Sequence, residues 1–152
     1  ADWAIKTTFA MTDKIPEEAL TSKVNSSFPS ILNTYQHIYQ WNKYYLTHLQ
    51  GGSINISDVE APLTYDDLKE ELPRLNQKLR TWAQENLPDN KNILLTGWAT
   101  WPVWMVIMQI ANHCTHHLGQ ILTLVRQAGY VPLQSDWTDL ILYYLKRFPQ
   151  RN

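Results

Sequence analysis

The segment from Pro102 to Ala128 constrains the fold of this chain more than any other stretch. Aliphatic residues recur in it every three or four positions, which is the spacing of one face of an α-helix, and Gly129 and Pro132 end the pattern. Strong alternation of apolar and polar residues, typical of a half-buried strand, is found nowhere in the sequence. We therefore predict a long helix over this segment and an all-α fold.

Capping signals place two further helices in the first third of the chain. Residues 1–13 are expected to form the end of one helix. A second helix is predicted from Pro29 to Gln50, because Ser27 or Phe28 precedes a proline at the first helical position and Gly51-Gly52 follows.

Capping and breaking residues also divide the remaining chain. Thr64 and Asp67 form a variant of the capping box and begin a helix that reaches about Leu87, in which Pro73 predicts a kink or a later start. Residues 91–100 fit either a short strand or a loop, and a last helix is expected from Ser135 to Phe148. These long amphipathic helices and the shorter terminal one predict an antiparallel four-helix bundle with an additional C-terminal helix.

Length and charge narrow the functional class. The 152 residues and 44% hydrophobic content predict a single domain over residues 1–152. A net charge of −1 without a basic stripe argues against a nucleic-acid partner. The longest apolar run, from Trp98 to Ile110, is shorter than the roughly 18–20 residues of a membrane span, so no membrane partner is expected. The single cysteine, Cys114, suits a reducing compartment, and we expect a cytoplasmic protein.

Three of the five histidines lie in the stretch NHCTHHLGQI, residues 112–121. Positions three and four apart share a helix face. One such stripe is aliphatic except for two histidines: Val106, Ile110, His113, His117, Ile121 and Leu124. Another is polar throughout: Gln109, Asn112, His116, Gln120, Thr123 and Gln127. His113 and His117 therefore point toward the core, whereas His116 points outward.

Two inward imidazoles one helical turn apart need partners, because an unsatisfied buried polar group costs about 1–3 kcal/mol. Their Cβ atoms lie roughly 6 Å apart, which suits two ligands of one cation. His37 lies on a core-facing stripe of the helix expected before Gly51 and is the best third ligand. His48 lies about 16 Å further along that axis and is interpreted as a helix-cap or surface residue. The alternative is a set of core histidines bonded to amides or tyrosines.

Three histidines without a fourth protein ligand describe an open metal site, as in catalytic zinc proteins. The stretch is not the HExxH of zinc proteases, because Cys114 stands where the glutamate base is needed. A carboxylate base would have to come from a loop, at Asp58, Glu60 or Asp136. The pattern favours chemistry that depends on the metal itself, either a bound thiolate attacking an electrophile or a metal-bound hydroxide.

Other residues near the predicted ligands have two interpretations each. Asn33, Tyr45 and Gln120 are candidates to hydrogen-bond the ligand imidazoles, or are ordinary polar residues. Four aromatic residues are candidate pocket walls or ordinary core: Trp41, Tyr45, Trp104 and Trp137. Cys114 is interpreted as a small buried hydrophobe, and Gly119 as the site of a close approach by another helix.

Two stretches of the chain resemble a known protein family. They are SFPSILNTYQHIYQWNKYYLTHLQGG, which contains His37, and ANHCTHHLGQILTLVRQAGYVPLQSDWTDLILYYL, which contains His113 and His117. Over residues 25–148 the chain is similar to the DinB/YfiT-like superfamily of metal-binding bundles. The resemblance implies an up-down-down-up four-helix bundle with an added C-terminal helix. It also implies a divalent metal, zinc or nickel, held by these three histidines, and a homodimer.

The resemblance leads to three hypotheses of function. Characterised relatives include transferases and isomerases that use low-molecular-weight thiols such as bacillithiol or mycothiol. The first hypothesis is therefore a metal-dependent transferase that joins a small-molecule electrophile to a thiol cosubstrate. The second is a metal-dependent hydrolase that uses metal-bound hydroxide, and the third is a non-enzymatic metal-binding stress-response protein. Leu118 stands where the family motif often has arginine, so any role of that arginine in binding an acidic group does not carry over.

Overall fold

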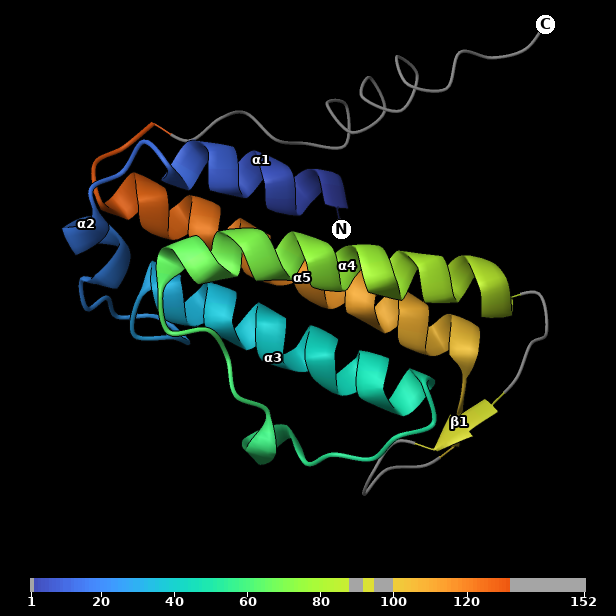
Figure 1. Cartoon of the computed structure of the whole chain (residues 1–152). Helices are drawn as coiled ribbons and strands as arrows, with labels where there is room; N and C mark the ends of the chain where they lie inside the picture. Colours follow the sequence, from blue (N-terminus) through green and yellow to red (C-terminus); the bar gives the residue numbers. More distant parts are fainter. Residues whose placement is uncertain (1, 88–91, 95–99, 132–152) are drawn as a thin grey trace, which may run out of the picture.

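The computed structural model describes residues 2–87, 92–94 and 100–131 of the chain. Its long helices are α1 (Asp2–Thr12), α3 (Ile31–Leu49), α4 (Tyr65–Asn86) and α5 (Val103–Gln127). The short elements are α2 (Glu17–Thr21), the 3-10 turn η1 (Ile56–Asp58), β1 (Asn92–Leu94) and β2 (Thr100–Pro102). The fold is an all-α bundle, as predicted (Figure 1).

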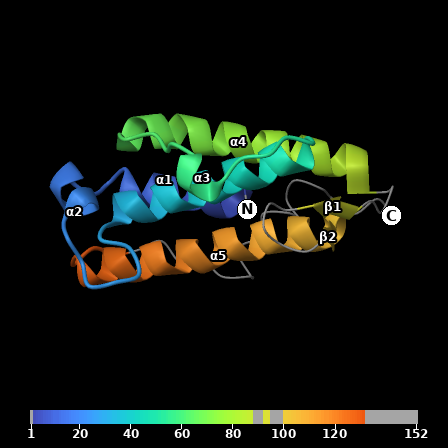
Figure 2. The ribbon, with the colours of Figure 1, turned by 90° about the horizontal axis from the view of Figure 1, so that it is seen from below.

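The long helices run up, down, down and up. In Figure 1, α1 and α5 run from right to left, whereas α3 and α4 run from left to right. α3 and α4 are parallel because the connection over residues 50–64, which contains η1, leads the chain back along the bundle. α3 packs against both α4 and α5, and α1 packs against the same two helices (Figure 2). This arrangement confirms the predicted bundle, while the predicted helix at Ser135–Phe148 lies outside the described residues.

α3 begins later than its sequence signals predicted. The Ser30 hydroxyl accepts a hydrogen bond from the backbone N–H of Asn33 at 3.1 Å, so Ser30 is the N-cap. The expectation of a cap at Ser27 or Phe28 was wrong. Pro29 lies before the helix rather than at its first position, because the hydroxyl of the serine that follows it accepts from one of the first free N–H groups of the helix, that of Asn33.

α4 starts where its capping signal predicted. Thr64 Oγ1 accepts a hydrogen bond from the N–H of Asp67 at 3.1 Å and donates to the Asp67 carboxylate at 2.6 Å. The helix continues through Pro73, so the later start is excluded. Gly51, with a φ of 82°, and Gly129, with a φ of 87°, end α3 and α5 as predicted, since glycine adopts this left-handed backbone without strain.

β1 and β2 form an antiparallel pair in which Ile93 is opposite Trp101. The ambiguous region 91–100 is therefore partly strand. The pair packs against the bundle through contacts of β1 with α3 and of β2 with α5, and this holds Trp101 close to both helices. Strands of 3 residues are too short for alternation to be visible in a sequence, so the pattern did not distinguish strand from loop here.

α1 is attached to the bundle by buried rings and hydroxyl groups. Phe9 stacks on Tyr35 with ring centroids 4.4 Å apart and an interplanar angle of 8°. Thr12 Oγ1 lies 3.1 Å from the Tyr35 hydroxyl and 2.6 Å from the Tyr65 hydroxyl. Burial raises the pKa of both tyrosines far above the ordinary value of 10.0, so both stay neutral. The helix expected at residues 1–13 is confirmed and belongs to the core.

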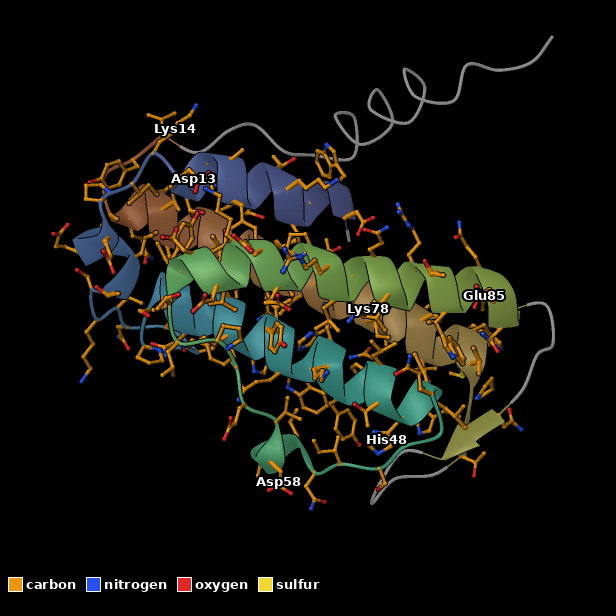
Figure 3. The ribbon with its side chains drawn as sticks, viewed as in Figure 1. Asp13, Lys14, His48, Asp58, Lys78 and Glu85 are labelled. Carbon is orange, nitrogen blue, oxygen red and sulfur yellow. The ribbon has the colours of Figure 1, made fainter. Side chains whose placement is uncertain are left out.

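Charged side chains lie on the outside of the bundle. Figure 3 shows Asp58, Lys78 and Glu85 at its surface, where each is exposed. Arg80 Nη1 pairs with Asp2 Oδ2 at 2.8 Å and links α4 to the start of α1. In the described part of the chain, none of the helices is long and apolar enough to cross a membrane.

Candidate metal centre

α3 and α5 bring three histidine side chains together. His37 Nε2 lies 3.1 Å from His113 Nε2, and His117 Nε2 lies 3.0 Å from the same atom. The ligand atoms of the three residues all lie within 4.8 Å of one another, so the group can hold one metal ion. These residues, called the histidine triad below, are the three that the sequence predicted as ligands.

The helix period explains how the triad forms. His113 and His117 are one turn apart on the face of α5 that packs against α3, where His113 is half-buried and His117 is buried. His37 comes from α3, which runs antiparallel to α5, so the two facing helices hold the three rings at one level of the bundle. His116 is exposed, as predicted, with its ring centroid 4.9 Å from that of His117.

Gln120 determines which nitrogen of His117 faces the other two rings. Gln120 Oε1 lies 2.8 Å from His117 Nδ1, and Gln120 Nε2 lies 3.2 Å from His116 Nε2. An amide oxygen only accepts hydrogen bonds, so His117 Nδ1 carries the proton. His117 Nε2 therefore directs a lone pair toward His113. The contact agrees with the predicted role of Gln120 as a partner of a ligand imidazole.

Hydrogen bonds alone do not satisfy the nitrogens of the triad. His113 Nε2 faces two other Nε2 atoms, but a neutral imidazole has one N–H, which serves at most one of these contacts. Among the described residues, His113 Nδ1 is buried without a hydrogen-bond partner. A cation accepts lone pairs from all three rings. Metal–nitrogen bonds of about 2.0–2.1 Å at angles of about 90–109° place two nitrogens about 2.8–3.4 Å apart, which matches both observed distances.

The site holds its imidazoles neutral. Burial and the neighbouring His117 lower the pKa of His37 from 6.5 to about 4. Burial and the other nearby histidines lower the pKa of His113 to about 3. Burial also lowers the pKa of His117. Neutral imidazole is the form that binds metals, so the triad can accept a cation at neutral pH without first losing protons.

Aromatic rings pack around the triad and hold its imidazoles in place. The Phe28 ring lies on His37, with centroids 4.3 Å apart, and meets His117 edge-on at 5.4 Å. Trp41 lies 6.3 Å from His37 and 5.9 Å from His113 between ring centroids. The sequence predicted Trp41 as a pocket residue but not Phe28. Phe28 comes from the loop before α3, and helix periodicity does not reveal where a loop side chain points.

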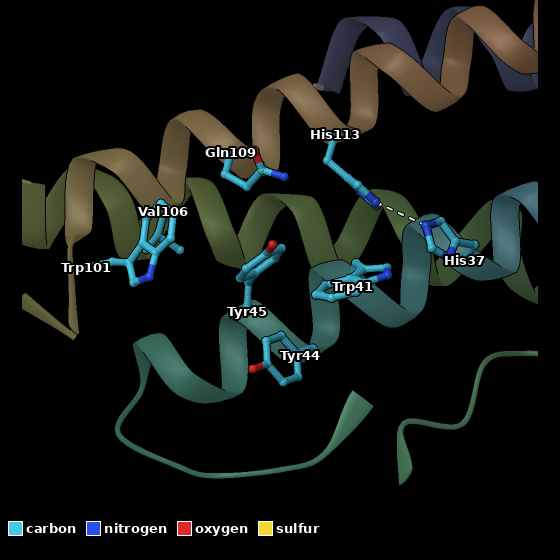
Figure 4. Close-up of a pocket in the computed structure, with 8 residues that line it drawn as sticks. All are labelled: His37, Trp41, Tyr44, Tyr45, Trp101, Val106, Gln109 and His113. Atoms are coloured by element: carbon cyan, nitrogen blue, oxygen red, sulfur yellow. Dashed lines mark hydrogen bonds between the residues drawn. The ribbon is translucent and has the colours of Figure 1, made fainter. Parts of the chain in front are cut away.

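A cavity of about 450 Å³ opens beside the triad, between α3, α5 and β2 (Figure 4). It is lined by His37, Trp41, Tyr44, Tyr45, Trp101, Val106, Gln109 and His113. Two triad residues thus form part of its wall, and most of the remaining wall is aromatic. A volume of this size is sufficient for a small organic molecule.

The sequence also predicted Tyr45 and Asn33 as candidates to hydrogen-bond the ligand imidazoles. Tyr45 lines the cavity, but its hydroxyl makes no hydrogen bond to an imidazole among the described residues. Asn33 hydrogen-bonds Ser30 and Gln36 at the start of α3, so its side chain is engaged away from the ligand rings.

The prediction that Trp104 walls the pocket was wrong, because this side chain is 46% exposed on α5. Trp101 occupies that role instead, from a strand whose position against the helices is set by tertiary packing. Trp137 lies outside the described residues.

Three other residues of α3 and α5 were also interpreted from the sequence. Cys114 is fully buried and contacts Asn42, as expected for a small core residue. His48 was expected at a cap or the surface, but it is buried, with Nδ1 3.0 Å from the Tyr44 carbonyl oxygen. The expectation of a close helix approach at Gly119 was wrong, since a Cβ atom there would meet nothing within 4 Å.

Comparison with known proteins places the chain in a family. Protein DinB of Bacillus subtilis (strain 168) is 22% identical over 156 residues, which cover 95% of this chain and 90% of that protein. The crystal structure of a DinB-like protein from Bacillus cereus ATCC 10987 matches with a TM-score of 0.69 and 19% identity, over 88% of this chain and 91% of that chain. The latter likeness establishes the fold alone. The model of the DinB family matches residues 1–144, and the chain therefore belongs to the DinB family.

Proposed function

We propose that this protein binds one divalent metal ion, zinc or nickel, through Nε2 of His37, His113 and His117, and is a metal-dependent transferase. Its substrates are a low-molecular-weight thiol and a small electrophilic molecule. The observation that carries the proposal is the convergence of three neutral imidazoles beside a cavity of about 450 Å³. An open three-histidine site next to a space for a substrate is typical of catalytic rather than structural metal sites.

The chain's own residues would prepare the site for this chemistry. Gln120 fixes the proton of His117 on Nδ1, and Phe28 restrains the rings of His37 and His117. These contacts orient the ligand nitrogens before the cation binds. The metal, when bound, stabilises a coordinated thiol as its thiolate, which is the nucleophilic form.

The cavity would hold the electrophile against the triad. Its wall includes the rings of Trp41, Tyr44, Tyr45 and Trp101, which exclude water and pack on apolar or planar groups. The reaction gains from this arrangement because two bound partners meet in a fixed orientation.

The composition of the cavity wall argues against hydrolysis assisted by a carboxylate base. Its eight lining residues include no aspartate or glutamate that could act as a base for water. The loop carboxylates considered from the sequence do not change this conclusion for the described residues. Asp58 and Glu60 are exposed and are not part of the wall, and Asp136 lies outside the described residues.

Metal analysis of matched variants tests the first half of the proposal. Purified protein is reconstituted with zinc or nickel, dialysed and measured by elemental analysis, beside His37→Ala and His116→Ala. We expect about one ion per chain in the wild type and in His116→Ala, and loss of the ion in His37→Ala. Circular dichroism establishes that each variant is folded. Full occupancy in a folded His37→Ala, or none in the reconstituted wild type, contradicts metal binding by the triad.

Cobalt substitution tests the second half. The absorption spectrum of the cobalt-loaded protein is expected to change when cysteine or bacillithiol is added, because a sulfur ligand introduces charge-transfer bands. The His116→Ala variant is expected to respond as the wild type does. An unchanged spectrum together with ester hydrolysis in the absence of thiol contradicts the transferase and supports the hydrolase.

A further inference from the structure

Two spaces formed by the described residues lie close to the histidine triad, and they differ in polarity. The first, called the aromatic cavity below, is the cavity of about 450 Å³ that has His37 and His113 in its wall, at the end opposite Trp101 (Figure 4). The second, called the polar groove, has a volume of about 310 Å³ and lies between the C-terminal half of α5 and the loop before α3. Amide and hydroxyl side chains predominate in its wall: Asn25, Ser26, Gln120, Thr123 and Gln127.

The polar groove comes close to the triad but does not open onto it. Gln120 lies in the wall of the groove, and Gln120 Oε1 is 2.8 Å from His117 Nδ1. None of the three triad histidines is part of that wall. The groove therefore ends one side chain away from the triad, whereas the aromatic cavity reaches two of its rings directly.

The loop before α3 carries the side chain that covers the triad next to the groove. Asn25 and Ser26 form one wall of the groove. Two residues further, the Phe28 ring lies on His37 and His117, with centroids 4.3 and 5.4 Å apart. Phe28 is half-buried and His117 is buried, so the Phe28 ring forms a layer between His117 and the solvent. Phe28 is not part of the wall of the aromatic cavity.

Backbone contacts hold Phe28 in this position. The N–H of Val24 donates a hydrogen bond to the carbonyl oxygen of Pro29 at 2.8 Å, which closes the loop on both sides of Phe28. Ser30, the next residue, is the N-cap of α3, the helix that also carries His37. The covering ring and one of the rings that it covers are thus fixed on the same element. An apolar ring held in this way keeps water and hydrated groups from the imidazoles, because they would lose hydrogen bonds on entering.

We propose that Phe28 separates the triad from the polar groove and so makes the aromatic cavity the route by which molecules reach the ligand nitrogens. A molecule that takes this route has to fit between the rings of Trp41, Tyr45 and Trp101. Phe28 therefore restricts the centre to narrow, largely apolar groups, and it keeps the hydrated molecules that suit the groove away from His117 Nε2. The closure itself requires no metal, whereas its consequence for substrates rests on the proposed function.

Acylation of histidines by diethyl pyrocarbonate tests the closure in the metal-free protein. The reagent modifies neutral imidazoles that it can reach, and peptide mass spectrometry gives the rate for each histidine. His117 is the reporter, because Phe28 covers it and the aromatic cavity does not include it. The exposed His116 is the internal reference. Ser27→Ala is the matched control, since Ser27 is exposed in the same loop.

Phe28→Ala should raise the acylation rate of His117 relative to His116 by about tenfold, which corresponds to roughly 1.4 kcal/mol. Ser27→Ala should react as the wild type does, and Phe28→Leu, which keeps an apolar cover, should give a rate between the two. Circular dichroism establishes that each variant is folded. With zinc bound, Phe28→Ala should lose the metal to EDTA about tenfold faster than Ser27→Ala, because the chelator then also enters from the groove.

Narrowing the other route tests the aromatic cavity as the entrance. Gln109→Trp adds a large side chain at an exposed position of the cavity wall, one helical turn before His113. Acylation of His37 and His113 should slow by about tenfold in this variant and recover when Phe28→Ala is added. Because Gln109 is exposed, the single variant tests the route even if Phe28→Ala does not fold.

Three outcomes overturn the inference. They are a wild-type rate of His117 equal to that of His116, an equal rate of His117 in the wild type and in folded Phe28→Ala, and unchanged rates of His37 and His113 in Gln109→Trp. A His117 that only Phe28→Ala exposes, in a protein that binds no zinc, supports the closure and contradicts the proposed function. Zinc and thiol binding with an equally reactive His117 in both proteins contradicts the closure and leaves the proposed function intact.

Discussion

Two polar clusters lie in the bundle, one joining α3, α4 and α5 and the other joining α3 and α5, and they satisfy their polar atoms differently. In the asparagine cluster (Asn42, Asn76, Cys114), Asn42 Nδ2 lies 2.7 Å from Asn76 Oδ1 and 3.4 Å from Cys114 Sγ. In the histidine triad, the Nε2 atoms face one another at 3.0 and 3.1 Å. His113 and Cys114 are adjacent in the chain, yet each belongs to a different cluster because consecutive helix positions point about 100° apart.

The two clusters differ in the hydrogen-bonding groups that they bring together. The asparagine cluster pairs the Asn42 amide with the Asn76 oxygen, so this central contact is complete within the protein, although Asn76 Nδ2 is buried without a hydrogen-bond partner among the described residues. Burial raises the pKa of the Cys114 thiol, which therefore stays protonated and shows no sign of activation. In the triad, the two contacts of His113 Nε2 cannot both be hydrogen bonds, because one nitrogen cannot donate a proton and accept another at once. The first cluster is a contact of the core, whereas the second has the donor atoms that the proposed metal binding needs.

The largest expected effect is the loss of zinc affinity when a residue of the triad is replaced. His117→Ala removes one ligand and should weaken zinc binding by more than about 100-fold, beyond the 10–100-fold typical of losing a residue that only supports a ligand. Competition with a chromophoric chelator measures this. Thr115→Ala is the control, since Thr115 is exposed on the same helix. An affinity of His117→Ala close to that of the control contradicts the comparison.

The asparagine cluster should affect stability rather than metal binding. Asn42→Ala leaves the buried Asn76 oxygen unpaired and opens space around it, so the free energy of unfolding should fall by about 2–3 kcal/mol. Urea denaturation of the metal-free protein gives this value. Zinc affinity of the folded variant should equal that of the wild type. A loss of affinity comparable to that of His117→Ala would show that the two clusters act as one unit.

A smaller effect is expected at the residue that orients the triad. Gln120→Leu removes the acceptor of the His117 Nδ1 proton, and zinc affinity should fall by about tenfold, with little change in stability because Gln120 is partly exposed. Gln127→Leu, an exposed glutamine of the same helix, is the matched control. Equal zinc affinities of these two variants would show that Gln120 does not orient a metal ligand.

The pH dependence of stability also distinguishes the clusters. The metal-free folded protein has a His37 pKa of about 4 and a His113 pKa of about 3, below the ordinary 6.5. Between pH 6.5 and about 4 the unfolded chain takes up protons that the folded chain does not, so stability falls as the pH falls through this window. Urea midpoints measured across this range should decrease toward acid. The decrease should persist in Asn42→Ala and flatten in a His37→Asn/His113→Asn variant, and an equal slope in all three contradicts the assignment.

The helical part of the site was predictable because it depends on local geometry. Helix period alone separated His113 and His117 from His116 and aligned His37 with the core. The partnership of Gln120 with His117 follows from the same rule, since residues three apart are neighbours on a helix. These predictions needed no knowledge of the path of the loops.

Residues contributed by loops and short strands were not predictable in this way. Phe28 and Trp101 were missed, and both come from segments outside the long helices. His48 was placed at a cap or the surface because it lies in the last turn of α3, but the packing around the end of that turn buries it. Periodicity describes one helix face and does not say what lies on top of it.

The amino-acid order therefore specified the helices and the helix face on which each side chain lies. Both follow from the helical repeat of roughly 3.6 residues per turn. It also placed the three histidines on faces that could meet. Only the tertiary structure decided that they meet beside a cavity, that Phe28 covers them and that Trp101 closes the far end. Those contacts join segments distant in the chain, and their formation depends on how the loops and the whole bundle pack.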